Sequence, residues 1–138
     1  MNIYKLEYIK FEEEVNNEIY FLGYFTTYEN TLKAVEIYSK MPGFKKNLNN
    51  FEIKEFNLSN LEKENIVFDV TIYYHNDNYS VEYFHCLGIY GDFLQAKNKL
   101  TKYEKLNQKI IENSIVYESF INKHTLDKYN ISEGFNTE

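Results

Sequence analysis

The sequence predicts an α+β fold built from two copies of a β-β-α-β unit, and two observations lead to this prediction. First, segments recur at an interval of 65 residues: Leu61–Ile66 returns as Leu126–Ile131, and Leu22–Phe25 returns as Leu87–Tyr90. Second, each half carries the apolar patterns of two strands, one helix and a third strand. Because the matches keep one register across a helix, a strand and a loop, we predict a tandem duplication.

The first half begins with a strand pattern over Ile3–Phe11, where apolar and charged side chains alternate with the period of a half-buried strand. Ile19–Phe25 is a nearly all-apolar strand, and the short polar connection before it predicts an antiparallel hairpin. A helix is expected to begin near Thr26, which forms a capping-box pattern with Glu29. Pro42-Gly43 is expected to end this helix, since proline cannot continue the backbone ladder.

The second half repeats this order. Val67–Tyr74 and Ser80–Tyr90 are predicted strands joined by a turn, and Asp92 is the expected cap of the second helix. Each half then closes with a third strand, over Phe51–Phe56 in the first and Ile115–Phe120 in the second.

We expect residues 1–60 and 61–131 to form the two units, and residues 132–138 to form a loose tail. The expected arrangement is a mixed, mainly antiparallel sheet, or two abutting sheets, with both helices packed on one face. The opposite face would then carry polar and aromatic side chains, namely Lys5, Glu7, Glu52, Lys54, Asp69, Thr71, Tyr73 and Glu118.

Composition indicates a folded, acidic chain. The 138 residues include 14 Tyr and 11 Phe, enough aromatic area to build a core even in a small unit. The formal net charge of −6 disfavours binding to phosphate backbones, so nucleic acid is an unlikely partner. The same charge would favour a basic partner protein, although it can also serve solubility alone.

The cellular location is predicted from cysteine usage and from apolar runs. Cys86 is the only cysteine, which excludes an intramolecular disulfide and fits a reducing compartment. Met1–Lys5 leads into a strand pattern and not into the apolar stretch of a signal peptide. No apolar run reaches the roughly 18 residues of a membrane-spanning helix. We therefore expect a cytoplasmic protein with no membrane association.

The first half resembles a family of small, uncharacterised bacterial and phage β-β-α-β domains. The resemblance rests on Leu22–Phe25, on the Met41–Phe44 segment after the helix, and on Phe51-Glu52-Ile53. In the family, a Leu-Pro-Gly-Phe motif follows the helix, and Met41-Pro42-Gly43-Phe44 is the corresponding segment here. The second half keeps Leu87–Tyr90 but lacks the Pro-Gly-Phe segment. The resemblance implies the fold of one unit and no activity.

No catalytic or metal-binding constellation is visible in the sequence. His75, His85 and His124 show no metal-ligand spacing, and Cys86 has no second thiol near it. Cys86 and His85 are neighbours on a predicted strand and would point to opposite faces. The glycines form no phosphate-binding motif. We therefore expect no cofactor, no metal and no enzymatic activity.

The function that the sequence favours is a non-enzymatic protein-binding module, either an immunity protein or a phage-encoded inhibitor that acts against a host defence. The alternative is a ligand-sensing or self-associating regulatory domain with a site between the two units, so that homodimerisation stays open. Tyrosine is enriched at binding interfaces, and acidic loop residues would suit a basic partner. The candidate partner-binding residues are Glu12, Glu13, Glu14, Glu18, Asp77 and Tyr73.

Overall fold

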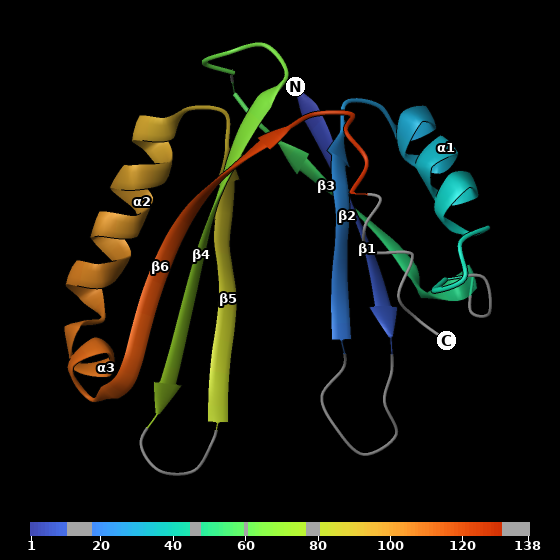
Figure 1. Cartoon of the computed structure of the whole chain (residues 1–138). Coiled ribbons are helices and arrows are strands. Elements are labelled where there is room, and N and C mark those ends of the chain that lie inside the picture. Colours follow the sequence, from blue (N-terminus) through green and yellow to red (C-terminus); the bar gives the residue numbers. More distant parts are fainter. Residues whose placement is uncertain (11–17, 45–47, 60, 77–80, 131–138) are drawn as a thin grey trace. The chain divides into compact units, whose positions relative to one another are not determined.

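The computed structural model describes residues 1–10, 18–44, 48–59, 61–76 and 81–130 (Figure 1). Its helices and strands confirm the α+β class. The described elements follow in this order: β1 (Asn2–Lys10), β2 (Glu18–Phe25), α1 (Tyr28–Tyr38), the short 3₁₀ helix η1 (Leu48–Asn50), β3 (Phe51–Asn57), β4 (Ile66–Asn76), β5 (Val81–Tyr90), α2 (Phe93–Leu106), α3 (Gln108–Glu112) and β6 (Ser114–Thr125). None of the described helices combines the length and the apolarity needed to cross a membrane.

The chain divides into two compact units. Unit 2 is Leu58–His124, and unit 1 is Met1–Asn57 together with Thr125–Glu138. The segment after β6 therefore belongs to the first unit, whereas the sequence placed residues 61–131 together. The tail expected at residues 132–138 lies outside the described residues.

The described strands form two separate three-stranded sheets, with strand orders β2-β1-β3 and β5-β4-β6. All neighbouring strands are antiparallel. The prediction of one mixed sheet is therefore wrong, whereas its alternative of two sheets agrees with the described strands. In each unit the first strand is already flanked on both edges by the other two strands of that unit. Each sheet carries its own helix: α1 packs against β1 and β2, and α2 packs against β4 and β5.

The starts of both main helices follow local sequence signals, whereas α1 ends at Tyr38, before the expected stop at Pro42-Gly43. Thr27 caps α1, since its side chain accepts a hydrogen bond from the Asn30 N–H at 3.0 Å, so the cap lies one residue after the position expected from the capping-box pattern. Asp92 caps α2 as predicted and accepts from the Leu94 N–H at 2.7 Å. After α2, the backbone turns at Asn107 and begins the short helix α3.

Each β-hairpin contains one bulge opposite a glycine. The register shifts between Leu6 and Glu7 opposite Gly23, and between Val70 and Thr71 opposite Gly88. Both glycines have positive φ, at 147° and 158°, a conformation that other residues rarely adopt.

The core of unit 1 lies between its sheet and α1. It is formed by fully or almost fully buried side chains, most of them aromatic or leucine: Leu6, Tyr8, Leu22, Phe25, Ala34, Tyr38 and Phe44. The Tyr38 hydroxyl donates to the Leu22 carbonyl at 2.9 Å, so even the polar atom of this buried ring has a partner. The other side of β2 also contributes a fully buried ring, Tyr24, which explains why this strand is apolar on both faces.

Unit 1 is completed by residues from far along the chain. The Asp127 N–H donates to the Tyr24 carbonyl at 2.8 Å, and the Asn130 N–H donates to the Leu22 carbonyl at 3.3 Å. The Tyr129 ring packs against Phe25 with ring centroids 5.7 Å apart. The segment Leu126–Asn130, which we call the β2 cover, thus lies along the edge of β2.

Candidate functional site

The two faces of the unit 2 sheet carry different side chains. The Phe68 ring contacts Phe93 of α2, which places the even-numbered β4 residues on the helix side. Asp69, Thr71 and Tyr73 alternate with these residues and lie on the opposite side, as the sequence predicted. The candidate site is built on this opposite side.

Tyr73 is the centre of this site. It is the cross-strand partner of Phe84, and the two rings lie 6.0 Å apart between centroids. The Tyr73 hydroxyl donates to the Glu82 Oε1 atom at 2.7 Å. This hydrogen bond raises the pKa of the Tyr73 phenol above its ordinary value, and the charges of Glu82 and Glu118 act in the same direction. Glu118 lies on the same side of the sheet as Tyr73, because it alternates along β6 with Asn122 and His124, which contact Asp69.

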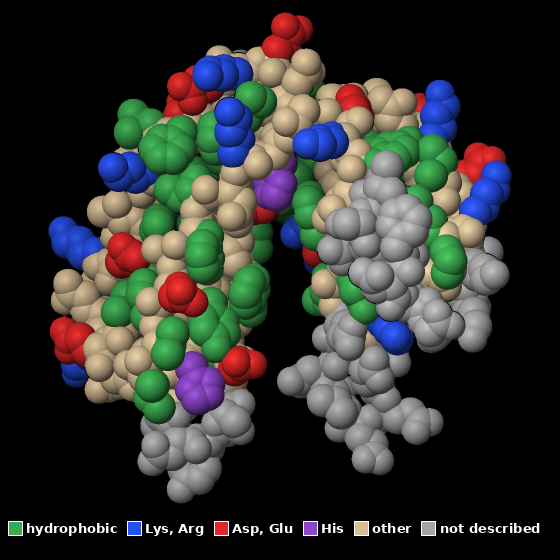
Figure 2. Space-filling model, in the orientation of Figure 1, with side chains coloured by type: hydrophobic (Ala, Val, Ile, Leu, Met, Phe, Trp, Pro, Cys, Tyr) green, Lys and Arg blue, Asp and Glu red, His purple; other side chains and the backbone are tan. Residues whose placement is uncertain are grey.

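Exposed apolar side chains surround this tyrosine. Phe84 is 70% exposed, Phe120 is 41% exposed and Val116 is 40% exposed. Val116 and Phe120 each lie two positions from Glu118, and alternation along β6 places all three on one face. We call this surface the acidic aromatic face, and it consists of Tyr73, Glu82, Phe84, Val116, Glu118 and Phe120. Hydrophobic and acidic side chains intermingle over the strands of unit 2 in Figure 2.

A buried polar cluster lies on the same side of the sheet. The Asp69 carboxylate is only 7% exposed and accepts from the Asn122 side-chain amide at 2.8 Å. The Nε2 atom of His124 lies 2.8 Å from the second carboxylate oxygen, and the Thr71 hydroxyl lies 3.4 Å from the first. Because Asn122 and His124 belong to β6, the cluster ties the end of this strand to β4. A buried carboxylate requires such partners, so the arrangement stabilises the sheet.

The corresponding side of the unit 1 sheet holds an ion-pair cluster. Glu7, which is 6% exposed, lies 3.2 Å from the Lys5 Nζ atom and 3.3 Å from the Lys54 Nζ atom. The prediction that Lys5, Glu7 and Lys54 share the side away from the helix is thus consistent with their contacts.

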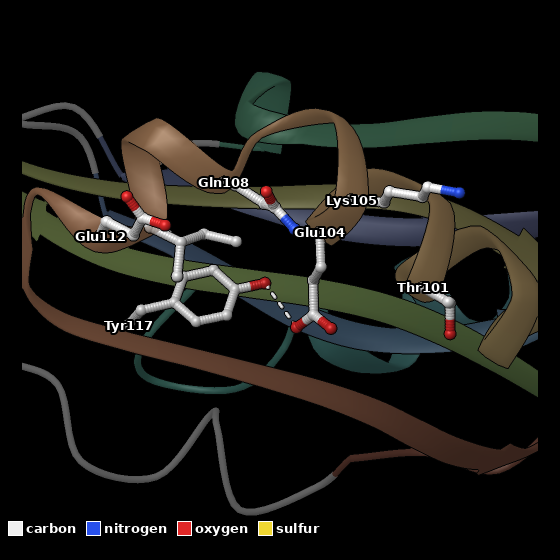
Figure 3. A pocket seen from close by; sticks show the side chains of 7 residues that line it. Thr101, Glu104, Lys105, Gln108, Glu112 and Tyr117 are labelled. Carbon is white, nitrogen blue, oxygen red and sulfur yellow. Dashed lines mark hydrogen bonds between the residues drawn. The ribbon is translucent and has the colours of Figure 1, made fainter.

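A groove of about 560 Å³ opens on the helix side of unit 2 (Figure 3). The Tyr117 hydroxyl points to Glu104 and donates to its Oε2 atom at 2.9 Å, while Lys105 extends away from this pair. Burial raises the pKa of the Tyr117 phenol, and the hydrogen bond to Glu104 raises it further. The residues lining the groove come from α2, α3 and β6: Thr101, Glu104, Lys105, Gln108, Ile111, Glu112 and Tyr117.

The structure places only some of the residues that were predicted to bind a partner. Tyr73 lies at the centre of the acidic aromatic face. Glu18 begins β2 and pairs with Lys10 of β1, but its side chain is not described. Glu12, Glu13, Glu14 and Asp77 lie outside the described residues.

Sequence reasoning missed Phe84, Val116 and Phe120. Their spacing places them on strand positions that share a face with Tyr73, but the same spacing is typical of core residues. The last strand was expected to end at Phe120, but β6 continues to Thr125 and includes His124. Within the described part of the chain, no group of three or more His, Cys, Asp or Glu side chains is placed to hold a metal ion.

No protein-family model, curated protein or solved structure matches this chain. The resemblance of the first half to small bacterial and phage domains therefore stays a prediction, as does the cytoplasmic location.

Proposed function

We propose that this chain is a non-enzymatic protein-binding module that engages a basic partner protein through the acidic aromatic face. The class of protein that we propose is an immunity protein or a phage-encoded inhibitor, which acts by covering a surface of its partner. The observation that carries the proposal is the exposure of Phe84 and Phe120 beside two acidic side chains.

The apolar part of this face supports binding by burial. Aromatic rings dominate the centres of protein interfaces because they combine a large apolar area with few rotatable bonds. Fully burying a phenylalanine side chain contributes roughly 1.5–3 kcal/mol, so covering the 70% exposed Phe84 ring should contribute about 1–2 kcal/mol. A few such rings are enough to anchor an interface.

The charged part of the face supports the choice of partner. Glu82 and Glu118 place negative charge next to the rings, and β4 and β5 contain no lysine or arginine. The chain as a whole carries a formal charge of −6. Charge complementarity speeds encounter and selects partners, so a basic surface fits this face.

The proposal is tested by capture of proteins from the source cell with three baits: the unmodified chain, Phe84→Ala and Leu94→Ala. Leu94 is the matched control, because it is 61% exposed but belongs to α2. We expect a basic protein that is retained by the unmodified chain and by Leu94→Ala, and whose affinity falls at least about tenfold with Phe84→Ala, the effect of about 1.4 kcal/mol. Equal retention by all three baits, or no partner above background, would contradict the proposal.

The ligand-sensing alternative keeps one supporting observation, the groove beside Tyr117 and Glu104. The site that the sequence placed between the two units stays a prediction. A small molecule that raises the Tm of the unmodified chain but not that of Glu104→Gln would favour a ligand-sensing function.

We also propose that the two units arose by duplication of one β-β-α-β unit. Three observations support this origin: the repeated segments of the sequence, the shared strand order with the first strand of each unit at the centre, and the bulges at Gly23 and Gly88. Coordinates for each unit that fail to superimpose element by element would contradict it.

A further inference from the structure

The strand β5 differs from its counterpart β2 in how its outer edge is covered. Both strands lie at the edge of a three-stranded sheet. An edge strand presents backbone N–H and C=O groups that can pair with another chain. In unit 1 the β2 cover occupies this edge, with backbone hydrogen bonds from Asp127 to Tyr24 and from Asn130 to Leu22.

The segment that repeats the β2 cover in the sequence, Leu61–Asn65, does not cover β5 in the same way. Its Glu62 N–H donates to the Gly91 carbonyl at 2.7 Å, and the Glu62 carboxylate accepts from the Phe93 N–H at 3.2 Å. Both contacts lie beyond the end of β5. Among the described residues, no backbone hydrogen bond from outside the β4–β5 pair reaches Tyr83, Phe84 or His85.

β5 has the bulge next to Gly88, but it lacks lysine and proline, two other features that usually protect an open edge. It is 10 residues long. Phe84 projects from it on the acidic aromatic face. On the other side of the sheet, Tyr83 stacks on Tyr74 with ring centroids 4.7 Å apart and lies 6.2 Å from the His85 ring. An added strand would therefore find ring surfaces beside it on both faces.

From these observations we propose that β5 receives an extended segment of the partner as an additional β-strand. The inference deepens the proposed function, because it rests on the same face and states how the partner binds there. Main-chain hydrogen bonds would supply affinity, and alternate side chains would supply specificity. The segment that fits has apolar side chains next to Phe84 and basic side chains near Glu82.

A second copy of this chain fits the same edge less well. Each copy carries a formal charge of −6, and pairing two β5 strands would bring two copies of Glu82 toward one interface. We therefore assign the edge to a basic partner and not to a homodimer.

The test uses the full chain and, as the probe, a synthetic peptide that repeats Val-Thr-Lys-Thr, so that valine and lysine alternate along the one face that meets Phe84 and Glu82. We expect binding that slows hydrogen exchange at those amides among Tyr83, Phe84 and His85 that face away from β4. Two further peptides carry N-methyl groups, either on the valine and lysine amides or on the threonine amides. An added strand uses the amides of one of its edges, so one methylated peptide should bind at least tenfold more weakly than the other.

The outcomes separate this inference from the proposed function. Binding that depends on Phe84 but leaves amide exchange at Tyr83–His85 unchanged, with equal affinities for both methylated peptides, would overturn strand addition and leave the face as the binding site. Absence of peptide binding would also overturn strand addition, and the capture experiment would then decide the proposed function alone. Protection of these amides by the chain itself, rising with protein concentration, would identify a second copy as the occupant and overturn the basic partner.

Discussion

Units 1 and 2 use the same order of elements, but they bury different amounts of their helices. In unit 1, α1 buries Thr31, Ala34 and Tyr38 against an aromatic core. In unit 2, Ala96 is the buried residue of α2, while Leu94 and Leu106 are 61% and 73% exposed. A unit whose aromatic side chains are inside gains stability from them, whereas exposed rings are available for binding. The comparison indicates that unit 1 gains more stability from its helix than unit 2 does, and the exposed rings of unit 2 fit our proposal that this unit binds the partner.

The strongest test of this comparison removes one apolar side chain from each unit. Phe44→Ala should destabilise the protein by about 3–5 kcal/mol, since it leaves a cavity among Tyr8, Tyr38 and Phe51. Leu106→Ala should change the free energy of unfolding by no more than about 0.5 kcal/mol, because the side chain is 73% exposed. Urea denaturation measures both values. Similar losses in the two variants would contradict the division between the units.

A second test compares the two bulge glycines. Gly23→Ala and Gly88→Ala both place a side chain at positive φ, at a cost of about 1–3 kcal/mol. At Gly23 the new Cβ would lie 2.8 Å from the Lys128 backbone carbonyl oxygen, which belongs to the β2 cover. At Gly88 it would meet the Tyr90 hydroxyl at 2.6 Å, the far end of a side chain that can move.

We therefore expect Gly23→Ala to lower the Tm more than Gly88→Ala does. Hydrogen exchange at the Asp127 and Asn130 amides should also accelerate in Gly23→Ala, because the β2 cover must shift. A larger loss of Tm in Gly88→Ala would show that the β2 cover is not a rigid part of unit 1.

The smallest expected effect is a decrease of stability at alkaline pH that depends on Tyr117 of unit 2. Burial, together with the hydrogen bond to Glu104, raises the pKa of Tyr117 above 10.0 in the folded chain. Below about pH 10 the phenol is neutral in both states, so the stabilisation is fully present. Above that pH the unfolded chain loses the proton first, and stability falls as pH rises.

Tyr117→Phe should make the decline of Tm above pH 10 shallower. Glu104→Gln is the control, and it should retain part of the decline because burial is the largest cause of the raised pKa. If the Tm of Tyr117→Phe fell above pH 10 as steeply as that of the unmodified chain, the decline could not be assigned to the Tyr117 phenol.

Local signals allowed the elements to be predicted, but not the pairing of all strands. Alternation and caps located every predicted strand and both main helices, because these depend on neighbouring residues. β6 was expected to end at Phe120 and continues to Thr125. Asn122 and His124 are polar and lie outside the apolar pattern of the predicted strand, but the buried Asp69 carboxylate, more than 50 positions away, holds them in β6.

The candidate site was predicted only in part for the same reason. Tyr73 was identified from its strand face, whereas Phe84 and Phe120 could not be distinguished from core residues by their spacing. Apolar residues on a strand predict burial in general, and only the packing of the sheet decides which of them stay exposed. The open edge of β5 likewise depends on where Leu61–Asn65 docks, and local pattern does not encode this.

The β2 cover has a consequence for the order of events during synthesis. The Thr26 N–H and hydroxyl donate to the Asp127 carboxylate across a separation of 101 residues. Unit 1 can therefore complete its folding only after synthesis has reached Asn130. Unit 2, Leu58–His124, is contiguous in sequence and can fold earlier. The N-terminal part of unit 1 is synthesised first but completes its folding last. Until the β2 cover has been made, the outer edge of β2 is open to pairing with other strands.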